Sequence, residues 1–441
     1  MIFTADDQLE LQKIYSLIRT EYLVYKQKYS GILSSVHSNH RLKADRFLNF
    51  LVLKKQVNEL DIIFSKYGLQ TSDYNILLEK FGSEPADKKP EGIVSCSKIS
   101  PVLVNIKDES INSHIHLLPI IESGISTFRI NCAFGKHEEW KKMQNNLLKA
   151  SGLCEKDCTL LFDLAGQKTR IISITDCKGN KLENIRIRKN ELLNLGVSEY
   201  SKDMESTYLQ IGSPENHQLP VEGERVRFDD SKVEAIVSSR TDQNIQIKVI
   251  KTSGSGVFLT PGKGVNFPDL KQSSSALTLK DKSDLSFAIR NGDIISFSFT
   301  NDQADIDLYH REIKNLSKKS PPVVIKIETQ QAVDQLEEIL LSCYQFEDVS
   351  ILLARGDLVS EMGFEQLPAI QKKIVEFTRY AGLPLIIATD VLENLNQNGV
   401  PSRSETIDAD IALRAEHILL NQGEFTVECI DLLKELRKKS K

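Results

Sequence analysis

Charged and polar side chains follow a series of short apolar segments, each at the point where the segment ends. Lys326 and Glu328 end one such segment, and Asp357 follows the next one along the chain. Successive side chains of a strand point to opposite faces, so Lys326 and Glu328 would share one face. Other segment ends carry Arg129 with Asn131, Asp163 with the nearby Arg170, and Thr389 with Asp390. In a parallel sheet all of these groups would meet at one edge.

Two acidic side chains of this set suit a divalent metal ion. Glu328 and Asp357 would offer hard oxygen ligands from neighbouring strands, and Mg²⁺ or Mn²⁺ completes such a pair with water. The cations Arg129, Arg170 and Lys326 favour a phosphate-bearing anion bridged to that metal, as phosphoryl transfer requires. Taken singly, each residue is more often half of a structural ion pair. Their convergence is hard to explain by packing, because a buried unpaired charge is costly.

Buried strands alternating with helical segments must position these side chains. The apolar segments that we predict as strands are Pro101–Ile106, Thr127–Asn131, Thr159–Asp163, Ile294–Phe299, Val323–Ile327, Val349–Ala354, Pro384–Ala388 and His417–Leu420. Amphipathic segments such as HEEWKKMQNNLLKA and FEQLPAIQKKIVEFTRYAG separate most of them. This alternation predicts an α/β protein with a (β/α)8 TIM barrel, whose site lies at the C-terminal ends of the strands.

One interval departs from this alternation. From about Ile171 to Ala276, β-branched residues and turn signals such as CKGNK and SGSG predict a β-barrel-like domain inserted after the third strand, where it would act as a lid. Residues 1–83 show helical periodicity and predict an N-terminal helical extension, and GSEPADKKPEG indicates a linker at 84–99. The barrel would then comprise residues 100–170 and 278–441, with the lid at 171–277.

Composition argues against several classes of function. The net charge is −5 and no basic stripe is present apart from the tail RKKSK, so nucleic acid is not an expected partner. No apolar run approaches the roughly 20 residues that span a bilayer, and the N-terminal MIFTADDQLE lacks the pattern of a signal peptide. The seven cysteines are odd in number, and Cys154 and Cys158 lack the other ligands of a zinc site. We expect a cytoplasmic protein with no membrane partner.

Seven segments around these positions form a recognisable series. In chain order they are FRINCAFGKHEEW, LLFDLAGQKTR, GKGVNFP, VVIKIET, ILLARGDL, LIIATDVLE and PSRSET. In this order they resemble the motifs of the pyruvate kinase family. INCA, DLAG and GFEQL are similar to an atypical bacterial branch with a helical N-terminal extension and no C-terminal regulatory domain. The resemblance implies Mg²⁺-dependent phosphoryl transfer from phosphoenolpyruvate to ADP, giving pyruvate and ATP in glycolysis.

The resemblance also implies a role for each matched residue around phosphoenolpyruvate. Arg129 would bind the phosphate of this substrate, and Lys326 would stabilise the phosphoryl group during transfer. Glu328 and Asp357 would hold the metal, and the backbone of Gly356 and Asp357 would meet the substrate carboxylate. These roles coincide with the site that the strand ends predict.

The remaining implied roles concern the enolate and the nucleotide. Thr389 would lie beside the enolate, and Asn131 and Arg170 would lie near the nucleotide phosphates. Four departures from the family pattern fall on the nucleotide side or the rim. They are NIKDES in place of the first strand's Thr-Ile-Gly-Pro, Phe134 in place of a histidine, Asp390 in place of glutamine, and Asn301 in place of a lid-side arginine.

The family's monovalent-cation site is altered as well. Its ligands match Asn131 and Asp163, but the serine ligand is Ala133 and the threonine is Leu164, which still offers a backbone carbonyl. Lys168 stands where members that do not need K⁺ carry lysine. The resemblance therefore predicts activity without K⁺, with the Lys168 ammonium supplying the positive charge. The alternative is a solvated lysine in the lid hinge.

Three functions remain open from sequence. An active pyruvate kinase accounts for Lys326 and for the lid, which a metal-dependent aldolase or lyase acting on pyruvate-like acids would not need. A catalytically weakened relative that serves as a sensor or interaction protein, with the helical extension as its partner surface, is favoured by NIKDES and Phe134. The sequence is compatible with a homo-oligomer and does not indicate an effector.

Overall fold

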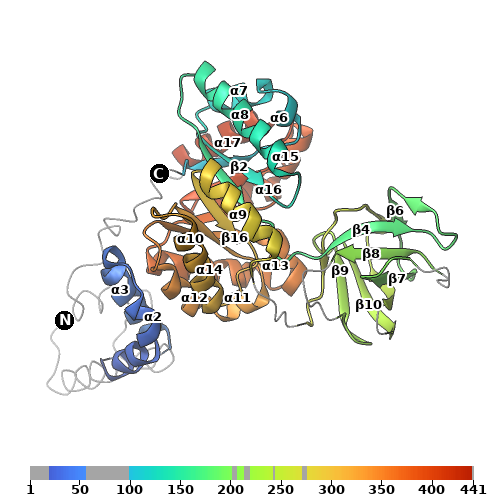
Figure 1. Ribbon diagram of the computed structural model, residues 1–441, viewed down its shortest axis with the longest axis horizontal. Coiled ribbons are helices and arrows are strands. Elements are labelled where there is room, and N and C mark those ends of the chain that lie inside the picture. Colours follow the sequence, from blue (N-terminus) through green and yellow to red (C-terminus); the bar gives the residue numbers. More distant parts are fainter. Residues whose placement is uncertain are drawn as a thin grey trace.

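The computed structural model describes residues 19–55, 99–200, 206–212, 219–241, 244–270 and 276–439 (Figure 1). The predicted linker, except for its last residue, and the greater part of the predicted N-terminal extension lie outside these ranges. Within them, no helix combines the length and the apolar character needed to cross a bilayer.

Eight parallel strands close into a barrel, which confirms the predicted fold class. The strands follow one another around the barrel in chain order, and the last pairs with the first. They are β1 (Val102–Asn105), β2 (Thr127–Asn131), β3 (Thr159–Asp163), β14 (Ile294–Phe297), β15 (Val323–Ile327), β16 (Val349–Ala354), β17 (Leu385–Ala388) and β18 (His417–Leu420). Each one lies within a segment that the sequence predicts as a strand.

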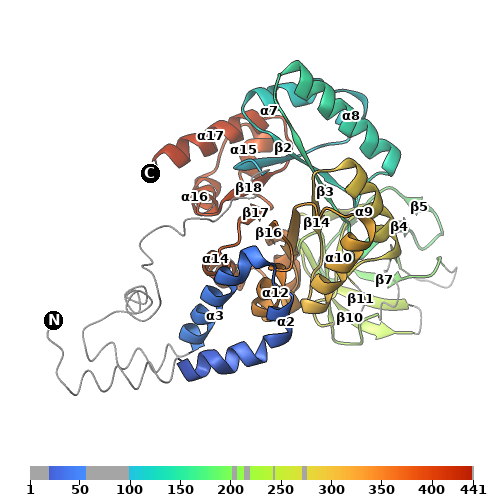
Figure 2. The ribbon, with the colours of Figure 1, turned by 60° about the vertical axis from the view of Figure 1, so that its left-hand side comes forward.

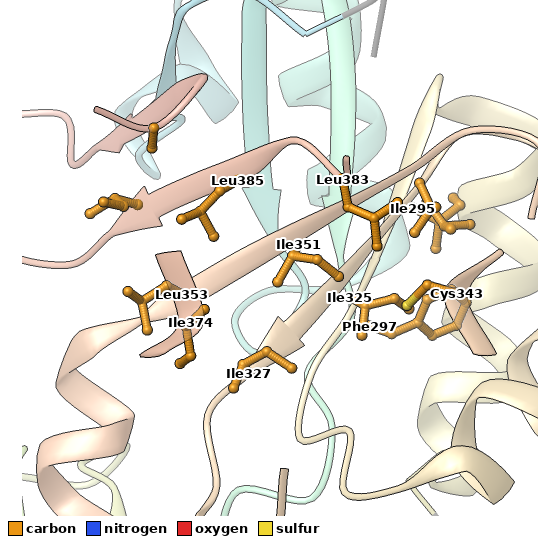
Figure 3. Packing of buried hydrophobic residues seen from close by; sticks show 14 of the residues in the cluster. Ile295, Phe297, Ile325, Ile327, Cys343, Ile351, Leu353, Ile374, Leu383 and Leu385 are labelled. Carbon is orange, nitrogen blue, oxygen red and sulfur yellow. The ribbon is translucent and has the colours of Figure 1, made fainter. Parts of the chain in front are cut away.

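Alternation along the strands decides which side chains enter the barrel. Ile325 and Ile351 pair in register and pack outwards with the helix residues drawn beside them in Figure 3. Val324 and Leu352 belong to a second apolar cluster, made mainly of residues from the barrel strands themselves. Because side chains two positions apart share a face, Lys326 follows Val324 and points into the mouth of the barrel.

Helices surround the barrel on its outside (Figures 1 and 2). In chain order they are α6 (Glu109–Asn112), η3 (Ile115–Leu117), α7 (Leu118–Glu122), α8 (His137–Leu153), α9 (Leu279–Asn291), α10 (Gln303–Leu316), α11 (Gln330–Asp334), α12 (Leu336–Cys343), α13 (Arg355–Met362), α14 (Leu367–Ala381), α15 (Glu393–Asn398), α16 (Arg403–Ala412) and α17 (Thr426–Lys439). Helix α13 begins directly where β16 ends. The first turn of α13 therefore lies at the C-terminal mouth of the barrel.

A separate β region lies between β3 and α9 in the chain, and we call it the lid. Its main sheet has the strand order β13 (Val265–Asn266), β9 (Arg225–Phe228), β10 (Val233–Arg240), β11 (Asn244–Lys251), β7 (Leu192–Gly196), β8 (Tyr208–Gly212), β4 (Arg170–Thr175) and β5 (Lys181–Leu182). A small second sheet pairs β6 (Ile185–Ile187) with β12 (Val257–Leu259). The lid has its own apolar core and projects to one side of the barrel in Figure 1.

The described N-terminal helices pack against the outside of the barrel. They include a helical stretch at 19–28, α2 (Ser30–Ser34), η1 (Ser38–His40) and α3 (Arg41–Lys55). Figure 2 shows α2 and α3 beside α12 and α14. The Phe50 ring stacks on Tyr380 with centroids 4.0 Å apart and meets Phe377 edge-on at 5.2 Å. Phe50 is 6% exposed, so this segment is part of the main apolar core.

Candidate active site

Arg129, Asp163 and Lys326 form a connected ion network at the mouth of the barrel. Asp163 ends β3 and is almost completely buried. Its Oδ2 accepts a hydrogen bond from Arg129 Nε at 2.8 Å and lies 3.2 Å from Lys326 Nζ. Burial raises the pKa of Asp163, but Lys326 and Arg129 together outweigh burial and hold that pKa below its usual value. The network therefore keeps two cations fixed at the mouth, with a carboxylate between them.

Two uncharged side chains orient these cations. Asn105, at the end of β1, accepts a hydrogen bond from Arg129 NH1 at 3.1 Å. Ser298, directly after β14, accepts one from Lys326 Nζ at 2.9 Å and donates one to the Leu164 carbonyl at 2.7 Å. The sequence predicts neither role. The available signal for Ser298 is its position near the C-terminal end of the predicted strand Ile294–Phe299, at the same end as the predicted site.

Glu328 is fully buried beside Lys326. Its Oε2 accepts a hydrogen bond from the Phe299 backbone N–H at 2.8 Å. Its Oε1 lies 2.8 Å from Lys326 Nζ as an ion pair but has no hydrogen bond. Burial raises the pKa of Glu328 to about 7 against the opposing effect of Lys326, and Asp357 raises it further. The last effect shows that the two predicted metal ligands lie within electrostatic range of each other.

Asp357 lies in the first turn of α13 and pairs with a lysine of its own. Lys168 Nζ is 2.6 Å from Asp357 Oδ1. Burial raises the pKa of Asp357, but Lys168 and Lys326 outweigh it, so that this pKa lies below its usual value. Asp357 is therefore ionised at neutral pH and is available as an anionic ligand.

This donor set fits a divalent cation. Glu328 supplies a buried carboxylate oxygen without a hydrogen bond, and Asp357 supplies an ionised carboxylate beside it. Within the described ranges no cluster of three or more His, Cys, Asp or Glu side chains is arranged to hold a metal. An ion bound by Glu328 and Asp357 would therefore leave most of its coordination positions to water or substrate. Mg²⁺ commonly binds proteins in this way.

Backbone groups at the start of α13 lie against Thr389. An added Cβ at Gly356 would come within 2.8 Å of Thr389 Cγ2, so only glycine allows this close approach. Arg355 also fixes the backbone of Thr389, because its Nη2 donates a hydrogen bond to the Thr389 carbonyl at 2.7 Å. Its Nη1 lies 2.6 Å from Asp408 Oδ1 in an ion pair. Thr389 itself has a φ of +73°, an unusual conformation for a β-branched residue. The structure thus brings Gly356, Asp357 and Thr389, which the sequence assigns to one site, close to one another.

Arg170 lies at the root of the lid, on the predicted nucleotide side. Its NH1 donates to the Gly262 carbonyl at 2.9 Å, and its guanidinium lies 5.0 Å from the centre of the Phe134 ring. Burial lowers the pKa of Arg170, although the group stays charged at any physiological pH. Phe134 is 50% exposed, so an aromatic face is open to solvent next to this arginine. Asn301, which stands in place of the family's lid-side arginine, is buried, and its Oδ1 accepts a hydrogen bond from the Thr329 hydroxyl.

The residues predicted for a monovalent cation each have partners within the protein. Asn131 Oδ1 accepts a hydrogen bond from the Ala133 N–H, and Asp163 and Leu164 both contact Ser298. Lys168 pairs with Asp357 in this structure. Replacement of K⁺ by Lys168 stays a prediction.

The comparisons with known proteins agree with this geometry. Residues 99–420 match the family model described as pyruvate kinase, barrel domain. A pyruvate kinase of Mycobacterium tuberculosis (strain H37Rv) is 29% identical over 311 residues, which are 70% of this chain and 62% of that protein. One of Thermotoga maritima is 28% identical over 334 residues, covering 73% of this chain and 66% of the relative. Pyruvate kinase 2 of a Synechocystis strain is 29% identical over 338 residues, covering 73% and 54%. The chain thus spans less than two thirds of the length of the relatives that it matches.

Proposed function

Since the chain belongs to the pyruvate kinase family, we propose that it transfers the phosphoryl group of phosphoenolpyruvate to ADP, with Mg²⁺ or Mn²⁺ bound, giving pyruvate and ATP. The observation that carries this proposal is the convergence of Arg129, Lys326, Glu328 and Asp357 on one mouth of the barrel. Two cations suit the charge of a phosphoryl group, and two carboxylates suit a divalent ion that bridges it. The free thiols of the described cysteines suit the cytoplasm, which we propose as the location.

Phosphoenolpyruvate would bind between Arg129 and the first turn of α13. The guanidinium of Arg129, already oriented by Asn105 and Asp163, would bind its phosphate. The first N–H groups of a helix have no partner within that helix, so those of Gly356 and Asp357 would bind the substrate carboxylate. The Gly356 contact with Thr389 would place the threonine hydroxyl beside the carbon that is later protonated.

Lys326 would stabilise the phosphoryl group as it moves. Lys326 is 8% exposed, and its ammonium contacts Asp163, Glu328 and Ser298. The ammonium is therefore already in place and would need little rearrangement during transfer. A divalent cation held by Glu328 and Asp357 would neutralise charge on the transferring phosphate. Arg170 would contact the nucleotide phosphates from the lid side, next to the exposed ring of Phe134.

A coupled assay of pyruvate formation with phosphoenolpyruvate, ADP and Mg²⁺ tests the proposal. Lys326→Met should lower kcat by roughly 100-fold or more, since loss of one group that stabilises transition-state charge costs about 3 kcal/mol or more. The matched control is Lys434→Met, which changes an exposed lysine of α17 and should leave kcat unchanged. Absence of turnover in the unmodified protein, with Mn²⁺-dependent phosphoenolpyruvate binding retained, would instead identify a sensor.

A further inference from the structure

Each of the two candidate metal ligands is paired with an ammonium group. Lys326 pairs with Glu328, and Lys168 pairs with Asp357. Lys326 has a proposed role in phosphoryl transfer, whereas Lys168 has none around phosphoenolpyruvate. Lys168 lies in the short connection between β3 and the lid, and its side chain is 14% exposed. A charged side chain so deeply buried at the root of the lid needs partners of opposite charge.

The lid encloses Lys168 from the other side. Asp230, in the turn between β9 and β10, places its Oδ1 3.7 Å from the same ammonium that binds Asp357. An added Cβ at Gly264 would collide with Lys168 Cε, so the lid backbone closes directly over this side chain. One lysine therefore bridges an acid of the barrel and an acid of the lid, and the Asp230 side chain is 46% exposed.

Other lid residues bind the same helix that carries Asp357. Arg227 NH1 donates to the Ser360 carbonyl at 3.1 Å. Asn266 Nδ2 donates to Glu361 Oε1 at 2.9 Å. The lid thus contacts α13 through hydrogen bonds, and α13 also carries Asp357 of the candidate metal site.

A divalent cation and the Lys168 ammonium cannot share Asp357 without repulsion. At separations near 5 Å this repulsion reaches the kcal/mol range even at the high effective dielectric of a protein surface. We propose that Lys168 is a movable internal counter-ion, which pairs with Asp357 in the metal-free protein and shifts to Asp230 of the lid when a divalent cation binds Asp357 and Glu328. Metal binding would then strengthen the Lys168–Asp230 ion pair and with it the packing of the lid on α13. This inference rests on the proposed metal site.

Mn²⁺ binding to the full chain without substrate tests the inference. Dissociation constants are measured by titration calorimetry or by electron paramagnetic resonance of free Mn²⁺. Lys168→Met should bind Mn²⁺ on the order of tenfold more tightly, because the competing charge is gone. Asp230→Asn should bind it roughly threefold more weakly, because the displaced ammonium loses its partner on the lid. Neither substitution alters a proposed metal ligand, and the two effects have opposite signs.

Lid position provides a second readout that does not depend on activity. Hydrogen exchange of backbone amides in 225–241 and 244–266 should slow on Mn²⁺ addition in the unmodified protein, and this change should be absent in Lys168→Met. Lys168→Arg keeps the charge and should retain near-normal Mn²⁺ affinity. If Lys168→Met does not fold, as its unfolding curve would show, Asp230→Asn at the more exposed acid still decides the question.

The controls separate failure of this inference from failure of the proposed function. Glu328→Gln should abolish Mn²⁺ binding. If Mn²⁺ binding survives in Glu328→Gln, the proposed metal site itself is wrong. If Glu328→Gln abolishes binding while Lys168→Met and Asp230→Asn leave the affinity unchanged, the metal site stands and the counter-ion inference is overturned.

Discussion

Ser298 offers the sharpest test of how the site holds Lys326, the lysine proposed to act in phosphoryl transfer. Its hydroxyl accepts a hydrogen bond from Lys326 Nζ at 2.9 Å and donates one to the Leu164 carbonyl at 2.7 Å, so it is fixed from both sides. Ser298→Ala removes one hydrogen bond to a charged group, which is worth about 1.5–3 kcal/mol. If the bond strengthens by this amount in the transition state, kcat should fall by about 10- to 100-fold.

The loss should appear in kcat more than in KM, because Lys326 would act mainly on the phosphoryl group during transfer. Steady-state rates over a range of phosphoenolpyruvate concentrations separate the two constants. Ser350→Ala is the matched control, since Ser350 is a fully buried serine of β16 whose hydroxyl has no hydrogen bond. A Ser298→Ala protein with the kcat of Ser350→Ala would refute the idea that Ser298 positions Lys326.

Three further outcomes are expected. Burial raises the pKa of Asp305 to about 6, above its unfolded value of 3.8, so the folded state binds this proton more tightly. Its contribution to stability is therefore present below pH 4 and is lost as the pH rises through about 6. Asp305→Asn should remove this pH dependence, which is worth roughly 3 kcal/mol, from urea unfolding curves. Phe50→Ala should lower the free energy of unfolding by about 3 kcal/mol, whereas Leu42→Ala, on the same helix but 64% exposed, should change it little. Turnover should be the same with K⁺ as with an inert monovalent cation, and a strong rise with K⁺ would contradict the role predicted for Lys168.

The barrel was predictable because its signals are local. Each strand is a short apolar run bounded by turns, and the two-residue alternation alone places Lys326 and Glu328 on the face of Val324. Glycine at the end of α14 likewise marks a helix end, since Gly382 has the left-handed φ of +62°. Charged residues at parallel strand ends then had to meet at one mouth, whatever the details of the helices between them.

The pairing of charges within the site was not predictable in the same way. From sequence, Asn105 is a residue of a predicted strand and part of a departure from the family, and neither interpretation predicts that it orients Arg129. Lys168 and Asp357 are 189 positions apart, and only the fold of the lid root decides that they pair. The segment HIHLLPIIESG between β1 and β2 also forms two short elements, η3 and α7, with Pro119 in the first turn of α7. Such features depend on tertiary contacts that periodicity does not encode.

The packing of α3 on α14 has a consequence for synthesis on the ribosome. Phe50 emerges early, but its stacking partner Tyr380 is made about 330 residues later, which takes roughly 15 to 65 s at 5–20 residues per second. During that interval Phe47, Leu48 and Leu51, all fully or nearly fully buried in the finished protein, have no binding surface on α14. The nascent chain should therefore depend on chaperones holding its N-terminal helix until the barrel is almost complete.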